Sequence, residues 1–260
     1  MFGKKGNILG LLLSAVCLYL VFQKVDMDRL WASLASLNYG FLAAALAVFL
    51  TTFLVRTTRW QSLLSPTKDV PYRRLFSVIF IGYMANNVLP ARLGELVRAY
   101  VLSKKEGVRK STTLATIFIE RIFDGLSLLF ILGAFMLAYE TGAIVLDAPL
   151  PGWVTKAGLL AGAGFLGAFG FVLALEFFPK SADLARGLIQ KFAPAKIAGK
   201  LEGILGAFVE GVSCLRSFPR LLFVFGASLL IWGIEGTTYF LLGEAFGMQL
   251  PIHVFLVTMV

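Results

Sequence analysis

Residues 112–139 read TTLATIFIERIFDGLSLLFILGAFMLAY, an apolar run with three ionisable side chains in its first half. A helix rises 1.5 Å per residue, so about 20 apolar residues cross the hydrocarbon core of a bilayer. The charged residues are Glu120, Arg121 and Asp124. Each costs about 2.5 to 3.5 kcal/mol at the centre of a span on insertion scales. We therefore expect a transmembrane helix whose charges find partners or water.

Similar apolar runs recur along the chain. Hydrophobic residues make up 58% of the sequence and charged residues 15%, and the mean hydropathy is +0.82. A soluble domain carries about 25% charged residues. The sequence predicts an all-α fold, a polytopic transmembrane helix bundle with a re-entrant helical hairpin, in a single transmembrane domain over residues 1–260. The expected spans are 7–23, 39–55, 112–138, 153–176 and 219–242, with a partial span at 252–260.

The two ends of the chain are read from the same pattern. Lys4 and Lys5 precede the first run, as in a signal peptide, but no small-residue cleavage site follows, so we expect an uncleaved first span. The last run is too short to cross a bilayer, which is consistent with a fragment of a longer protein.

The net charge of +9 is concentrated in particular loops. Lys and Arg are frequent in 56–74 and 180–220, whereas 139–152 and 243–251 contain neither. Basic loops stay on the cytoplasmic side, so we place the first two segments and the N-terminus there. Because the charge follows loops rather than one continuous basic surface, we expect no nucleic-acid partner. The expected location is the cell (plasma) membrane of a prokaryote.

The run 75–90 is short for a span and has basic residues on both flanks. A full crossing would invert every later loop, so we predict a re-entrant hairpin over 75–102 instead. Its tip would be Asn86 to Pro90, because proline disfavours helix at the preceding residue. Non-helical backbone at this depth has to be buried in protein or line a wet cavity. We therefore expect a polar cleft that water reaches.

Residues 197–215 carry apolar side chains at helical spacing, with polar side chains on the other faces. This pattern favours an amphipathic helix at the cytoplasmic membrane surface. The alternative is close packing against another helix through the small residues Gly199, Gly203 and Ala207.

The second arm of the predicted hairpin carries Arg92, Glu95 and Arg98. We expect these side chains to meet Glu120 and Asp124 at one depth, because intramembrane charges pair with one another. The planar guanidinium of arginine binds two phosphate oxygens at once. The functional interpretation is a binding site for an anionic lipid headgroup between the hairpin and the span 112–138. The alternative is a salt-bridge network that only holds the hairpin in place.

The stretch NNVLPARLGELVR at 86–98, followed by IERIFDG at 119–125, resembles the membrane region of the lysylphosphatidylglycerol synthase and flippase-like family. Arg59 and Trp60 also resemble it. The resemblance implies a multi-pass bundle that moves or presents lipid-linked or modified phospholipids, and it does not extend to the soluble aminoacyl-transfer domain of the full synthases. The motif positions, which are the candidate headgroup-binding residues, are Asn86, Asn87, Pro90, Arg92, Gly94, Glu95, Arg98, Glu120, Arg121 and Asp124.

Some weaker sequence features have a structural explanation as well as a functional one. Glu235 in the span 219–242 either lines the same cavity or bonds a neighbouring helix, and with Arg59 it is a possible further site residue. The GAGFLG stretch at 162–167 favours helix packing over nucleotide binding, because no strand precedes it. His253 is interpreted as an interfacial residue. No HExxH, P-loop or GxSxG pattern occurs, so we expect no catalytic residue, no metal site and no cofactor.

These observations predict a flippase-like membrane protein, not an enzyme, that binds and translocates or presents an anionic or modified lipid. Its expected partners are membrane lipids. Two alternatives stay open: the membrane subunit of a lipid-modifying transferase, and a non-catalytic scaffold for a partner glycosyltransferase.

Overall fold

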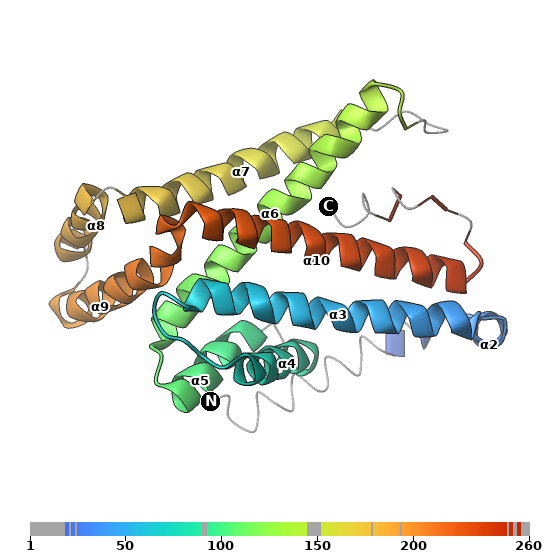
Figure 1. Ribbon diagram of the computed structural model, residues 1–260, viewed down its shortest axis with the longest axis horizontal. Coiled ribbons are helices and arrows are strands. Elements are labelled where there is room, and N and C mark those ends of the chain that lie inside the picture. Colours follow the sequence, from blue (N-terminus) through green and yellow to red (C-terminus); the bar gives the residue numbers. More distant parts are fainter. Residues whose placement is uncertain are drawn as a thin grey trace.

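The computed structural model describes residues 19–20, 22–23, 25–89, 93–144, 152–177, 179–192, 194–248, 250–251 and 254–255, and within them every regular element is a helix. Four helices are long and apolar enough to cross a membrane, so the chain is a multi-pass membrane protein. They are α3 (Tyr39–Leu64), α6 (Lys110–Glu140), α7 (Gly152–Phe177) and α10 (Phe218–Ala245) (Figure 1). The expected runs 7–23 and 252–260 lie largely outside the described residues.

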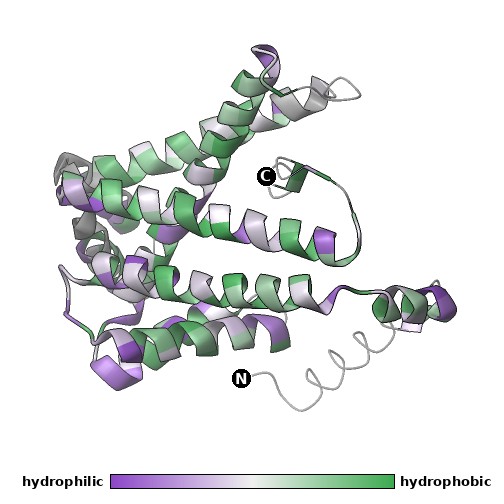
Figure 2. Ribbon diagram, turned by 45° about the vertical axis from the view of Figure 1, so that its right-hand side comes forward, coloured by the Kyte–Doolittle hydropathy of each residue, from purple (hydrophilic) through white to green (hydrophobic). Residues whose placement is uncertain are grey.

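The remaining elements are shorter. In Figure 1, α5, α8 and α9 gather at one end of the long helices, and α2 lies at the other. Figure 2 shows hydrophobic residues along the long helices and hydrophilic residues in α5. The short elements are α2 (Met27–Ala35), α4 (Tyr72–Val88), α5 (Gly94–Glu106), α8 (Pro179–Phe192), α9 (Ala195–Val212) and the 3₁₀ turn η2 (Ser213–Arg216).

α3 and α10 lie side by side along most of their length (Figure 1). α3 continues to Leu64, nine residues beyond the end of the apolar run at 55. The helix continues because the bundle takes in its first basic residues: Arg56 is 8% exposed and Arg59 is 1% exposed. A guanidinium that meets carboxylates inside the bundle does not have to end the span.

α4 and α5 form an antiparallel helical hairpin. At its open end Arg74 Nη1 lies 2.6 Å from Glu106 Oε1, and at its tip the backbone N–H of Gly94 donates to Asn86 Oδ1 at 2.7 Å. The two arms approach so closely that a Cβ on Gly94 would lie 2.0 Å from the carbonyl oxygen of Gly82. Only glycine fits at that contact.

The hairpin lies against the second half of α3. The ring of Phe53 lies 4.7 Å from that of Phe80 and 5.2 Å from that of Tyr83, centroid to centroid. The tip therefore ends beside the middle of α3, while the base lies near Leu64. Entry of this hairpin into the bilayer stays a prediction.

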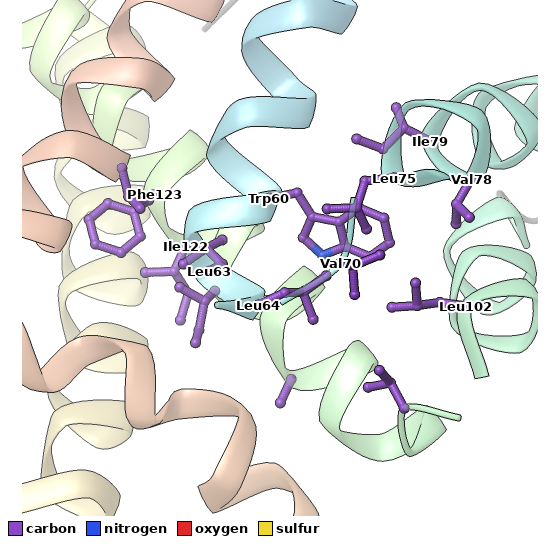
Figure 3. Packing of buried hydrophobic residues seen from close by; sticks show 14 of the residues in the cluster. Trp60, Leu63, Leu64, Val70, Leu75, Val78, Ile79, Leu102, Ile122 and Phe123 are labelled. Carbon is purple, nitrogen blue, oxygen red and sulfur yellow. The ribbon is translucent and has the colours of Figure 1, made fainter. Parts of the chain in front are cut away.

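Apolar side chains fill the space between the base of the hairpin and the long helices. Trp60 is fully buried at the centre of this cluster, between α3 and the hairpin (Figure 3). Leu75 of α4 and Leu102 of α5 approach it from the hairpin, and Ile122 belongs to the α6 side of the cluster. This packing fixes the position of the hairpin relative to α3 and α6.

The segment expected as an interfacial helix forms α9, which packs against α6. Ala207 is 1% exposed, and a Cβ on Gly211 would lie 2.6 Å from that of Ala115. Gly199 and Gly203 have open space around them, so the close contact falls one to two turns later than the small-residue row suggests. Apolar side chains remain exposed on α9, and its place at the membrane surface stays a prediction; they include Ile197, Leu201 and Ile204.

Candidate functional site

One turn of α6 supplies the acidic part of the site. Glu120 is 1% exposed and Asp124 is 4% exposed, and the two lie four residues apart on one face of the helix. Arg121 Nη2 lies 3.4 Å from Asp124 Oδ2, but its side chain is 44% exposed. The two carboxylates therefore depend mainly on cations from other helices.

Arg59 of α3 is the central cation. Its Nη1 donates to Asp124 Oδ1 at 2.5 Å and to Ser228 Oγ of α10 at 2.6 Å, and its Nη2 lies 3.6 Å from Glu120 Oε1. One buried guanidinium thus joins three spanning helices. The charge-assisted bond to Asp124 is of the strong kind, because both groups are ionised and removed from water.

Arg98 brings the hairpin to the same site. Its Nη1 lies 3.0 Å from Glu120 Oε2, without the alignment of a hydrogen bond. Its guanidinium carbon stands 4.1 Å from the ring centroid of Trp60, a cation–π distance. The indole N–H of Trp60 donates to Thr116 Oγ1 at 3.1 Å, which fixes the ring. Arg98 Nε and Nη2 are buried and make no hydrogen bond.

Two further ion pairs border this centre. Arg121 Nε lies 3.5 Å from Glu95 Oε1 of α5, and both side chains are more than 40% exposed. Arg56 Nη2 donates to Glu235 Oε1 of α10 at 3.0 Å, and both of these side chains are mostly buried. We call the eight residues the central cluster. Its four arginines and four carboxylates balance in charge: Arg56, Arg59, Arg98, Arg121, Glu95, Glu120, Asp124 and Glu235.

A narrow space remains between these side chains. It is too narrow for a water molecule. The water-accessible cleft expected from the sequence is therefore closed in this structure, because the side chains pair directly. The residues around it are mostly arginines: Arg56, Arg59, Arg98 and Arg121, with Ile79, Tyr83 and Glu120.

The structure brings together five of the residues chosen from the sequence: Glu95, Arg98, Glu120, Arg121 and Asp124. Asn86 and Gly94 instead join the two hairpin arms to each other.

The other chosen positions lie elsewhere. Asn87 is exposed, and its side chain donates back to the carbonyl of Tyr83 in its own helix at 3.2 Å. Pro90 and Arg92 lie outside the described residues.

Sequence reasoning treated Arg56 as a loop residue and Arg59 as a secondary candidate. The signal for both was their spacing, three residues apart at the end of an apolar run, which places them on one side of a helix. Ser228 carried no signal, because a serine in an apolar span more often bonds its own helix. Here its hydroxyl donates to the Val224 carbonyl of its own helix and also accepts a hydrogen bond from Arg59 of α3.

The fold and the site together define an all-α, multi-pass membrane protein with a charge-balanced cluster buried among its helices. The chain belongs to the family described as the lysylphosphatidylglycerol synthase TM region, whose model matches residues 7–260. The resemblance seen in the sequence motifs is thereby confirmed.

Related proteins come from archaea, which agrees with the expected prokaryotic origin. Glycosyltransferase AglD of Haloferax volcanii is 25% identical over 94% of this chain and 42% of its own length. A UPF0104 membrane protein of Methanocaldococcus jannaschii is 24% identical, over 60% of this chain and 48% of its own length. A UPF0104 membrane protein of Methanothermobacter thermautotrophicus is 24% identical, over 76% of this chain and 60% of its own length. The matches thus span less than two thirds of these relatives, and no solved structure matches the chain.

Proposed function

We propose that the protein takes a lipid headgroup into the arginine-lined space of the central cluster and translocates it or presents it, flippase-like, to a partner. The observation that carries this proposal is the unused hydrogen-bonding capacity of Arg98. Its Nε and Nη2 are buried without a partner, although a buried donor without a partner costs about 1 to 3 kcal/mol. Once the adjoining space opens, a phosphate that enters it would accept from both nitrogens at once, because the guanidinium fork matches two phosphate oxygens.

The cost of the cluster favours a function over a purely structural role. Each charge inside a membrane costs about 2.5 to 3.5 kcal/mol on insertion scales. Replacing a buried ion pair by well-packed apolar residues is often neutral or stabilising. A bundle that needed only stability would do as well with apolar side chains at Arg59, Arg98, Glu120 and Asp124.

The charge balance restricts the headgroup. The cluster is neutral, so an entering phosphate would leave an uncompensated negative charge unless a cation came with it or a carboxylate moved away. A headgroup that carries both a phosphate and an amine satisfies this condition. Its phosphate would bind Arg98 and Arg59, and its amine would bind Glu120 or Asp124.

Arg121 and Glu95 provide the way in. They pair at 3.5 Å between α6 and the hairpin, yet their side chains are 44% and 41% exposed. Charges exposed at this depth require water or a headgroup beside them, because hydrocarbon does not solvate them. Separation of this pair and of Arg98 from Glu120 would let the hairpin tip move away from α6 and open the closed space.

The test is a headgroup-flip assay in proteoliposomes that contain phosphatidylglycerol and phosphatidylethanolamine. We expect the double variant Arg98→Gln with Glu120→Gln to flip at the rate of protein-free vesicles. The two changes remove the Arg98–Glu120 pair together, and Arg59, which also lies near Glu120, keeps Asp124 and Ser228 as partners, so the variant should still fold.

The matched control is Arg109→Gln, which removes an arginine whose side chain is 73% exposed and 3.7 Å from Glu210. It should flip as the wild type does. Equal rates for the double variant and the wild type, with both proteins monodisperse, would contradict the proposed function.

A second candidate function rests on the likeness to glycosyltransferase AglD, which extends over 94% of this chain. In this reading the bundle is the membrane part of, or a scaffold for, a lipid-modifying transferase, and the basic α8–α9 region docks the partner or anionic lipid. Neutralising Lys191, Lys196 and Lys200 tests it. Loss of partner recovery with flipping unchanged would favour the scaffold, and unchanged recovery would exclude this docking site.

A further inference from the structure

A second pocket lies between α3 and α10, in the half of these helices beyond the hairpin tip. Its volume is about 280 Å³ and its walls are mainly apolar. Leu42, Leu46 and Phe49 line it from α3, and Tyr239 and Leu242 line it from α10. By the loop charges, this half of the bundle faces the outer leaflet.

The pocket meets the central cluster at one ion pair. Glu235 lines the pocket, and Arg56 lines the narrow space among the arginines. The two side chains bond each other at 3.0 Å and are only 10% and 16% exposed. Arg56 also stacks over the ring of Tyr83 at the hairpin, 5.3 Å from its centroid. The Arg56–Glu235 salt bridge thus links a residue that lines the pocket to one that lines the closed space.

We propose that the α3–α10 pocket is the outer half of the lipid route, a second site for the same lipid, and that Arg56 with Glu235 is the barrier between the two halves. This inference rests on the proposed function. A headgroup with a phosphate and an amine exchanges with the barrier without a change in net charge: the phosphate binds Arg56, and the amine binds Glu235. The hydrocarbon chain lies against the apolar walls beside them.

Another pocket lacks a charged pair like Arg56–Glu235 and therefore serves as a comparison. It lies between α6 and α10, measures about 400 Å³ and is lined by Phe130, Ala134, Leu229 and other uncharged residues. None of the residues that line this pocket is charged, so none of them is a member of the central cluster. It has room for a hydrocarbon chain but no group that recognises a headgroup, so it serves as a built-in control.

The experiment fills each pocket in turn. Ala45 is 1% exposed and lines the α3–α10 pocket, and Ala134 lines the α6–α10 pocket. Both variants, Ala45→Phe and Ala134→Phe, are placed in vesicles containing phosphatidylethanolamine, and amines reaching the outer leaflet are scored with a membrane-impermeant amine reagent. We expect Ala45→Phe to lose flipping, to the rate of protein-free vesicles, and Ala134→Phe to retain it.

Leu46→Trp is the reserve variant if Ala45→Phe does not fold, because Leu46 is 58% exposed and a larger side chain there extends over the pocket. Wild-type flipping by the folded pocket variant would overturn the inference, and so would equal losses in both pockets. If flipping still depends on Arg98 and Glu120 in either case, the proposed function stands and only the outer route fails. If flipping depends on neither, both fail.

Discussion

Two groups of ion pairs hold the same hairpin, and they differ in their access to solvent. In the central cluster, Arg98 pairs with Glu120, and their own side chains are only 5% and 2% exposed. At the open end of the hairpin, Glu106 binds Arg74 at 2.6 Å and Lys68 at 3.3 Å, and these cations are 60% and 44% exposed. We call this second group the base cluster.

This difference in exposure suggests different roles for the two clusters. The Glu106 carboxylate is buried, but both of its cations are exposed and can exchange it for water at little cost, so we expect these pairs to contribute about 1 kcal/mol or less. Buried charges have no such exchange, and removal of one partner costs about 3 to 5 kcal/mol. The base cluster therefore contributes little to holding the hairpin. Of the two groups of ion pairs, those of the central cluster mainly determine the position of the hairpin.

The largest effect should come from Asp124→Ala, because it leaves the buried Arg59 without its nearest carboxylate. We expect a loss of about 3 to 5 kcal/mol in the free energy of unfolding, measured by denaturant titration in detergent. Asp183→Ala is the control, since Asp183 pairs with Arg186 on exposed α8 and its side chain is 67% exposed. A loss below about 1 kcal/mol for Asp124→Ala would mean that Arg59 is hydrated.

A smaller effect is expected from Gly94→Ala, which tests the close contact of the hairpin arms. The added Cβ would lie 2.0 Å from the Gly82 carbonyl oxygen, so the arms must separate. We expect a loss of about 1 to 3 kcal/mol in the same titration, the usual range for overpacking. Gly203→Ala has no atom near its added Cβ and should stabilise α9 by up to about 1 kcal/mol. Equal behaviour of the two variants would contradict the contact.

The smallest effect concerns pH at the base cluster. The hydrogen bond from Arg74 lowers the pKa of Glu106 below its ordinary value of 4.5, burial opposes this, and Lys68 adds to the lowering. Because the folded pKa is the lower one, the stabilisation is present above pH 4.5 and is lost as the pH falls through the folded value. Relative to Glu106→Gln, the wild type should lose at most about 1 kcal/mol on acidification. Parallel pH curves for the two proteins would show that the ion pairs contribute nothing.

The sequence predicted the four spanning helices α3, α6, α7 and α10, because apolar runs of the required length have few other uses. It also placed Arg98 opposite Glu120, since opposite charges in apolar surroundings seek each other.

Arg59 was underrated for a physical reason. Counting basic residues in loops assumes that every arginine near a span end lies in water, and Arg59 does not. Its partners on α6 and α10 are distant in sequence, so no local pattern could reveal them. The closed state of the site was equally hidden, because it depends on side-chain packing among four helices.

The three-way bond of Arg59 also affects how the chain is made. Its carboxylate partner is 65 residues later in the sequence, and its hydroxyl partner is 169 residues later. At about 5 to 20 residues per second, synthesis of the intervening chain takes several seconds before Asp124 emerges. Throughout that interval the nascent α3 carries Arg59 without the Asp124 carboxylate that binds it in the folded protein, so we expect α3 to reach its final position only once α6 is present. We therefore expect the membrane insertion of these two helices to be coupled, although they are translated separately.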